Sequence, residues 1–186
     1  NTHTRALDRV AEATEKCGLQ IADDDIVVCV QGDEPMMRPD MIDTVIAPLE
    51  QDPDATCTVL AMAVTDEALF RNPDTVKIVH DLKGRVLYTS RSAIPHCPEG
   101  EFSAATGARR IYGILAFRWA HLKWFNETPE SPLELIESCD SNRICDHGGG
   151  QLIAPYPDIE SFSVDSPADR DKVEAHMEQD PFWGKY

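Results

Sequence analysis

Two short apolar runs predict buried strands in the first third of the chain. Residues 26–30 read Ile-Val-Val-Cys-Val, a run that is too short for a helix and rich in β-branched side chains, and residues 56–64 form a second apolar run. Between them, apolar residues recur at helical spacing over residues 39–52, where a proline opens the segment. Residues 8–17 show an apolar stripe typical of an amphipathic helix. The pattern therefore begins helix, strand, helix, strand.

The middle of the chain predicts a hairpin and then a long loop. After a short helical turn at residues 67–71, the apolar runs at 75–80 and 85–88 are joined through Leu-Lys-Gly at 82–84, which indicates two antiparallel strands. Residues 94–108 contain two prolines, two glycines and little periodicity, so we expect a surface loop there. A hairpin among buried strands predicts a mixed sheet.

The last third returns to alternating elements. We expect a strand at 111–117, helices at 119–125 and 131–145, and a final strand at 159–164 followed by a helix that Ser166 caps and Pro167 begins. Strands that alternate with helices predict an α/β fold. With 186 residues and 42% hydrophobic residues, the chain suits one domain spanning residues 1–186.

Composition restricts the class of partner. The formal net charge of −16 argues against nucleic-acid binding, which needs clustered lysine and arginine. A small anionic ligand is still compatible with this charge if a few local arginines or a carboxylate-bound cation offset it. No apolar run is long enough to cross a bilayer, and the first residues lack the order of a secretory signal. We therefore expect a cytoplasmic protein that does not bind membranes.

Two aspartates stand where predicted strands end. Asp33 follows the strand at 26–30, and Gly32 before it permits backbone angles and close ligand approach that other residues do not. Asp165 follows the strand predicted at 159–164. Two such carboxylates can converge on one Mg²⁺, which prefers oxygen ligands. Taken singly, Asp33 is equally typical of a solvated turn, and Asp165 of a residue that supports a helix N-terminus.

Four motifs stand in an order that resembles the 3-deoxy-manno-octulosonate (Kdo) cytidylyltransferases, and the resemblance covers nearly the whole chain. The motifs are Gln31-Gly32-Asp33-Glu34-Pro35, Ser90-Arg91-Ser92-Ala93-Ile94-Pro95, Ser131-Pro132-Leu133-Glu134-Leu135-Ile136-Glu137 and Val164-Asp165-Ser166-Pro167.

The resemblance implies both a fold and a reaction. The fold would be a Rossmann-like nucleotidyltransferase domain with a mixed, mostly parallel sheet and helices on both faces. The reaction would transfer CMP from CTP to Kdo or a related 2-keto-3-deoxy sugar acid, with pyrophosphate leaving. The resemblance also implies a homodimer in the cytosol of a cell that builds Kdo-containing surface polysaccharide.

The resemblance assigns a role to each candidate site residue. Asp33 and Asp165 would hold the Mg²⁺ that supports the displacement at the α-phosphate. The residues that would contact the nucleotide or the sugar acid are Arg9, Gln31, Gly32, Arg91 and Glu134. Arg91 would also be catalytic.

Three of these residues also fit purely structural roles. Arg9 is compatible with a solvated helix position, and Arg91 with a loop arginine paired to one of many acids. Ser131 and Glu134 have the spacing of a capping box, in which the Glu134 carboxylate would satisfy backbone donors instead of sugar hydroxyls.

The chain also departs from the family pattern. The family's first strand and basic phosphate-binding loop are expected before residue 1, and this chain is expected to lack them. Ile111 and Leu135 stand where the family usually has histidine and glutamine, which predicts a variant 2-ulosonic acid as substrate. Ala6-Leu7 replaces a small pair expected before Asp8. Two alternatives stay open: a non-catalytic paralogue or fragment that acts as a binding or assembly module, and a cytidylyltransferase for nine-carbon sialic acids.

Overall fold

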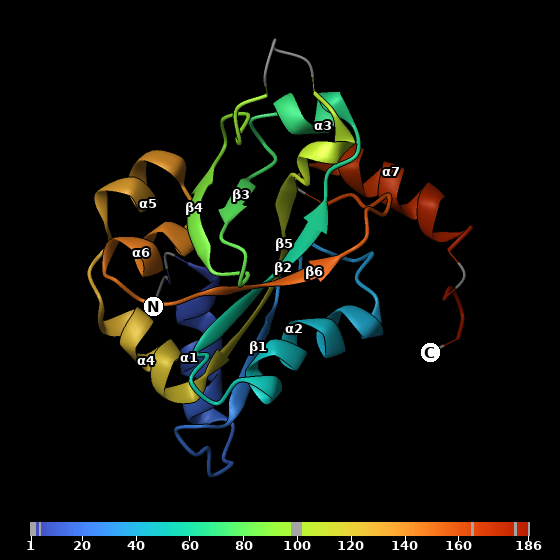
Figure 1. Cartoon of the computed structure of the whole chain (residues 1–186). Coiled ribbons are helices and arrows are strands. Elements are labelled where there is room, and N and C mark those ends of the chain that lie inside the picture. The colour runs from blue at the N-terminus through green and yellow to red at the C-terminus, as the bar shows by residue number, and fades with distance from the viewer. Residues whose placement is uncertain (1–2, 4, 98–101, 165, 181, 186) are drawn as a thin grey trace.

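The computed structural model describes residues 3, 5–97, 102–164, 166–180 and 182–185. Within these ranges a single sheet runs through the molecule, with α1, α4, α5 and α6 on one side and α2 on the other (Figure 1). None of the helices within these ranges has the length and apolar character needed to cross a lipid bilayer.

The elements follow the order that the sequence pattern predicts, with a few exceptions treated below. In chain order they are α1 (Ala6–Lys16), β1 (Ile26–Val30), α2 (Pro39–Gln51), β2 (Cys57–Ala63), α3 (Glu67–Arg71), β3 (Lys77–His80), β4 (Val86–Ser90), the 3-10 helix η2 (Ala104–Thr106), β5 (Arg109–Arg118), α4 (Trp119–Glu127), α5 (Pro132–Glu137), α6 (Asp140–Asp146), β6 (Leu152–Tyr156) and α7 (Pro167–Met177).

The sheet is built around β5, its longest strand. The strand order is β4-β3-β5-β2-β6, and β1 pairs with the second half of β5. The mixed sheet of an α/β fold is thus confirmed, but the expectation of a mostly parallel sheet is wrong. Among the hydrogen-bonded pairs of described strands, only β2 with β6 is parallel; β1, β2 and β3 each pair antiparallel with β5, and β4 pairs antiparallel with β3. Apolar runs identify strands and carry no information on their direction.

Two apolar layers cover the two faces of the sheet. Alternate residues of β2 point to opposite sides, as strand geometry requires. Cys57, Val59 and Ala61 pack with Leu7 of α1, together with α4 and α6. The other β2 side chains join the α2 layer, whose fully buried residues include Met41, Val45 and Leu49. Helices on both faces are therefore confirmed, and the helical spacing over residues 39–52 marks the buried stripe of α2.

Two predictions near the C-terminus are wrong. Residues 159–164 form no strand; the strand is β6, whose Ala154 pairs with Leu60 of β2. Pro155 lies inside β6, and proline is unusual in the interior of a sheet, which explains why the pattern does not reveal this strand. The helix expected over residues 131–145 is two helices, α5 and α6, because Ser138 adopts a left-handed conformation with φ of 49°.

Candidate active site

A cleft of about 580 Å³ lies between α1 and the carboxyl end of β1. It is lined by Ala6, Arg9, Val10, Ala13, Cys29, Val30, Gln31, Gly32 and Asp33. The tertiary structure thus gathers four of the predicted site residues, namely Arg9, Gln31, Gly32 and Asp33, from two separate elements. Arg91 and Glu134 do not line this cleft.

The cleft is shaped by the way the chain leaves β1. After Val30, which pairs with Ile114, the Gln31 N–H donates to the Gly113 carbonyl at 3.2 Å, and the Glu34 N–H donates back to the Gln31 carbonyl at 3.2 Å. A Cβ atom on Gly113 would stand 2.9 Å from Gln31 Oε1. Gly113 therefore allows the Gln31 side chain to lie across β5 at the site.

Arg9 and Asp33 offer opposite charges to a ligand in this cleft. Both residues are exposed, and neither side chain makes a hydrogen bond or an ion pair with the described residues. Beside them, burial raises the pKa of the Cys29 thiol to about 11, so this cysteine is a neutral apolar wall at pH 7 and no nucleophile. The arrangement can bind an anionic group through Arg9 and a cation through Asp33.

A second acidic side chain, Glu34, lies behind the turn. Its Oε1 accepts a hydrogen bond from Ser163 Oγ at 2.8 Å, and the N–H of Val164 donates to the Asp33 carbonyl at 2.9 Å. Sequence reasoning did not place Glu34 in the site, since 129 residues separate it from Ser163 and no periodic pattern links them. Residue Asp165 follows this segment in sequence and lies outside the described residues.

Among the described residues, Asp33 is the one member of the expected Mg²⁺ site, and its carboxylate is a suitable ligand. The described residues contain no group of three or more His, Cys, Asp or Glu side chains arranged to hold a metal ion. The expected Mg²⁺ site needs both Asp33 and Asp165, and the structure describes only Asp33. The Mg²⁺ site therefore stays a prediction.

Arg91 follows the last residue of β4, and its guanidinium is hydrogen-bonded to other parts of the protein. Arg91 Nε donates to the Glu137 carbonyl at 2.9 Å and Nη1 donates to the Pro73 carbonyl at 3.1 Å. The Glu137 carboxylate accepts from the Arg91 N–H at 2.9 Å, from Ser90 Oγ at 2.7 Å and from the Tyr88 hydroxyl at 2.6 Å. The guanidinium therefore holds two backbone carbonyls and forms no ion pair with an acid among the described residues, so the expected pairing with an acid is not seen there and the catalytic role of Arg91 stays a prediction.

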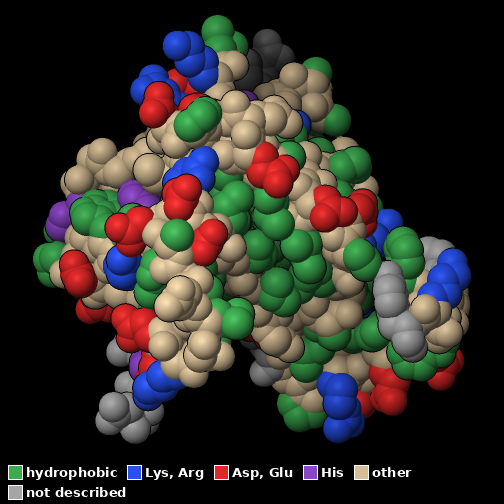
Figure 2. All heavy atoms as spheres, turned by 90° about the horizontal axis from the view of Figure 1, so that it is seen from below, with side chains coloured by type: hydrophobic (Ala, Val, Ile, Leu, Met, Phe, Trp, Pro, Cys, Tyr) green, Lys and Arg blue, Asp and Glu red, His purple; other side chains and the backbone are tan. Residues whose placement is uncertain are grey.

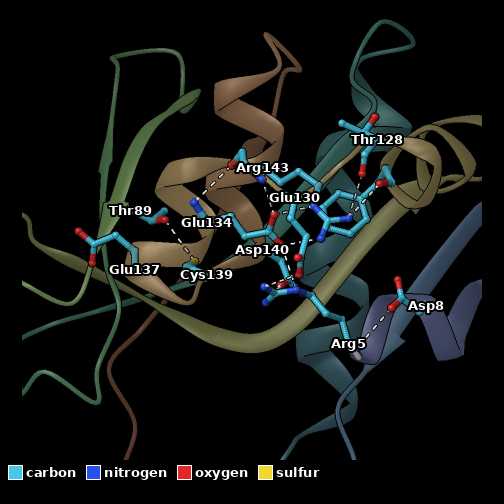
Figure 3. Close-up of polar contacts among 12 residues, drawn as sticks. Arg5, Asp8, Thr89, Thr128, Glu130, Glu134, Glu137, Cys139, Asp140 and Arg143 are labelled. Atoms are coloured by element: carbon cyan, nitrogen blue, oxygen red, sulfur yellow. Dashed lines mark hydrogen bonds and ion pairs between the residues drawn. The ribbon is translucent and has the colours of Figure 1, made fainter. Parts of the chain in front are cut away.

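Glu134 lies at the centre of a buried ion network between α1, α5 and α6 (Figure 3). Its side chain is 0% exposed. Arg143 donates to its two oxygens at 2.6 and 2.7 Å, Arg5 Nε lies 2.9 Å from Oε1, and the Ser131 N–H donates to Oε2 at 3.1 Å. The capping box expected for Ser131 and Glu134 is therefore present.

The electrostatics of Glu134 match this structural role. Burial alone would raise the pKa of its carboxyl, but hydrogen bonds from Arg143 and Ser131 and the charge of Arg5 outweigh burial and lower it. Arg5 extends the network to Asp140 at 2.8 Å. In this conformation the Glu134 carboxylate is enclosed and accepts from protein donors at both oxygens, which does not favour the predicted contact with a sugar.

One face of the molecule reflects the net charge. Figure 2 shows one face of the molecule, on which Asp and Glu side chains are scattered around an apolar area with a few Lys and Arg among them. The net charge of −16 argues against a broad cationic surface of the kind that binds nucleic acid.

Comparison with known proteins gives consistent matches along nearly the whole chain. A family described as "Cytidylyltransferase" matches residues 1–152. The 3-deoxy-manno-octulosonate cytidylyltransferase of Syntrophotalea carbinolica is 35% identical over 181 residues, which cover 94% of this chain and 70% of that protein. The enzyme of the same name from Desulfosudis oleivorans is 38% identical and covers 91% and 66%. The chain thus spans about two thirds of the length of these relatives.

Solved structures agree with the sequence matches. The structure of a CMP:2-keto-3-deoxy-manno-octonic acid synthetase complexed with CTP superimposes with a TM-score of 0.82 at 31% identity, covering 95% of this chain and 69% of the other. A glucose-1-phosphate thymidylyltransferase from Bacillus anthracis, described as putative, shares the fold at a TM-score of 0.56 and 12% identity. This chain belongs to the cytidylyltransferase family, on the branch of the 3-deoxy-manno-octulosonate cytidylyltransferases.

Proposed function

We propose that this protein transfers CMP from CTP to Kdo or a closely related 2-keto-3-deoxy sugar acid. The relatives that carry this activity in their names match more than nine tenths of the chain, and one structural neighbour was solved with CTP. The observation that carries the proposal is the cleft that brings Arg9, Gln31, Gly32 and Asp33 together. These residues come from α1 and from the end of β1, where a nucleotide site is expected in an α/β fold.

The reaction needs groups that orient two anionic substrates. The anomeric hydroxyl oxygen of the sugar acid attacks the α-phosphorus, its proton is lost, and the bond from that phosphorus to pyrophosphate breaks. The Arg9 guanidinium lines the cleft and has no hydrogen bond or ion pair with the described residues, so it can hold a phosphate or carboxylate. Gln31 supplies an amide for hydrogen bonds, and Gly32 leaves the backbone open to close approach.

The proposed cofactor is Mg²⁺, held by Asp33 and Asp165. Asp33 fits this role because its carboxylate is exposed in the cleft and has no partner among the described residues. A bound Mg²⁺ would stabilise the negative charge that develops on the α-phosphate and on the leaving pyrophosphate. The Val164 N–H, one residue before Asp165 in the chain, bonds the Asp33 carbonyl, which supports a shared site.

We propose the class of the sugar acid, the 2-keto-3-deoxy sugar acids, and not one member of it. Ile111 packs against the apolar layer on the α1 side, and Leu135 is exposed; neither lines the cleft. A variant 2-ulosonic acid as an alternative to Kdo therefore rests on the family resemblance alone, in which both positions usually carry hydrogen-bonding groups. Comparing kcat/KM for Kdo and for a set of 2-keto-3-deoxy sugar acids would decide between them.

The test is pyrophosphate release from CTP in the presence of Kdo and Mg²⁺. We expect turnover by the unmodified chain and a loss of at least about 100-fold in kcat with Asp33→Asn, the size of effect seen when one electrostatic stabiliser is removed. Asp43→Asn is the matched control, since Asp43 is an exposed carboxylate on α2. Full activity of Asp33→Asn would exclude the metal role. Absence of any heat on titrating CTP and Mg²⁺ would favour a non-catalytic binding module.

We also propose, from the family resemblance alone, that the protein is a cytosolic homodimer. Light scattering of the purified chain gives its mass directly, and a mass near 20.7 kDa would contradict the dimer. Fractionation of cells that express the protein tests the compartment. The roles proposed for Arg9, Gln31 and Asp33 depend on neither the dimer nor the compartment.

A further inference from the structure

The turn after β1 is joined to a segment far along the chain. Ser163 Oγ donates to Glu34 Oε1 at 2.8 Å, and the Val164 N–H donates to the Asp33 carbonyl at 2.9 Å. In the part of the chain that the structure describes, these are the polar contacts between residues 31–34 and residues 161–164. The segment is also attached to β5, since Ser161 Oγ donates to the Tyr112 hydroxyl at 2.9 Å.

Glu34 is held in a place that costs the protein free energy. The carboxylate is partly buried, with the Tyr112 hydroxyl and Arg110 also beside it, and its Oε2 makes no well-aligned hydrogen bond with the described residues. An enclosed carboxylate oxygen without a donor is unfavourable, and such exceptions are often found at functional sites. The side chain fits there because Gly113 has no Cβ: a methyl group on Gly113 would come within 2.9 Å of Glu34 Cγ. β5 therefore leaves room for Glu34 to reach Ser163.

We propose that Glu34 is a positioning residue, which holds residues 161–164 against the Asp33 turn through its hydrogen bond with Ser163. The consequence for catalysis rests on the proposed function, because it assumes that Asp33 and Asp165 share Mg²⁺. Mg²⁺ demands nearly ideal octahedral geometry. A tether that holds the Asp33 turn against residues 161–164 would preorganise the Asp33 carboxylate for the metal.

The tether itself is tested by hydrogen exchange of the Val164 amide in the full chain. Glu34→Ala and Ser163→Ala each remove one partner, and we expect exchange to become about tenfold faster, the effect of losing one hydrogen bond to a charged group. Glu34→Gln keeps an oxygen that can accept from Ser163, so its exchange should stay within about twofold of the unmodified chain. Glu160→Ala is the control, because it removes an exposed carboxylate just before this segment whose partner is His176, at 3.8 Å, and not the Asp33 turn. Unchanged exchange in both Glu34→Ala and Ser163→Ala would overturn the proposal.

The positioning role is tested by titrating the same variants with Mg²⁺ during turnover. We expect the apparent Mg²⁺ constant to rise about five- to tenfold in Glu34→Ala and Ser163→Ala, with kcat at saturating Mg²⁺ within about threefold and with rescue by Glu34→Gln. An unchanged Mg²⁺ constant in variants whose exchange is faster would overturn the positioning role. If the unmodified chain shows no Mg²⁺-dependent turnover, the proposed function fails, and the exchange measurement still decides whether Glu34 tethers the segment.

Discussion

Replacing Glu134 with alanine removes the acceptor that two arginines share in the interior of the protein. Arg143 is 5% exposed and donates two hydrogen bonds to Glu134, while Arg5 forms a second ion pair with the same carboxylate (Figure 3). The substitution leaves the charge of Arg143 buried. The family resemblance instead predicts that Glu134 binds sugar hydroxyls, so the two interpretations make opposite predictions about this variant.

The expected loss of stability depends on the hydrogen-bond partners that Arg5 and Arg143 retain in Glu134→Ala. Breaking a buried pair by removing one partner costs about 3–5 kcal/mol. Arg5 retains Asp140 at 2.8 Å, and Arg143 retains the carbonyl oxygens of Phe125 and Thr128, each at 3.3 Å. We therefore expect a value at the low end, about 3 kcal/mol. For a chain of this length that corresponds to a fall in Tm of roughly 6–12 °C.

The assay is urea unfolding of Glu134→Ala beside the double variant Glu134→Met/Arg143→Met. The double variant removes both charges and fills the space with apolar atoms, so it should recover most of the lost stability. KM for the sugar acid should stay within about threefold of that of the unmodified chain in whichever variants fold. If Glu134→Ala lost less than about 1 kcal/mol while KM rose more than tenfold, the carboxylate would be a substrate ligand and the reasoning would be refuted.

Three further predictions concern other buried or crowded groups. The ring of His121 stacks on Trp124, with ring centroids 4.5 Å apart, and burial lowers its pKa from 6.5 to about 4. As pH drops from 6.5 to 4, the unfolded chain therefore binds a proton before the folded protein does, and the free energy of unfolding should fall. His121→Phe should remove this pH dependence, as measured by urea titrations at several pH values. Burial would raise the pKa of Glu137, but its hydrogen bonds lower it below the ordinary 4.5. Its contribution is therefore present above pH 4.5 and is lost as pH falls through the lowered pKa, so Glu137→Gln should be less stable than the unmodified chain at pH 7, and the difference should shrink as pH falls below 4.5 in urea titrations. Gly113→Ala should cost about 1–3 kcal/mol, chiefly by crowding Glu34 Cγ, because the tip of Gln31 can turn away, and an unchanged Tm would contradict the 2.9 Å contact with Glu34.

The sequence pattern located part of the candidate site and missed another part. Asp33 could be found because it directly follows an apolar strand, and Arg9 because its helix resembles a family segment; the structure places both in one cleft. Glu34 and Ser163 could not be found as a pair, since their contact depends on where the segment after β6 crosses the sheet. Glu134 shows the opposite case. Its capping box was readable from the spacing to Ser131, whereas its arginine partners come from α6 and from the start of α1.

By itself, the sequence determined the elements whose stability is local or repeats along the chain. Its apolar runs located β1 and β2, its helical stripe located α2, and Ser166 with Pro167 located the start of α7. The tertiary structure alone decided the directions of the strands, the role of β6 as a strand despite Pro155, and the break between α5 and α6 at Ser138. Strand direction and long-range polar contacts arise from pairing between segments distant in sequence, and side-chain periodicity carries no information about such pairing.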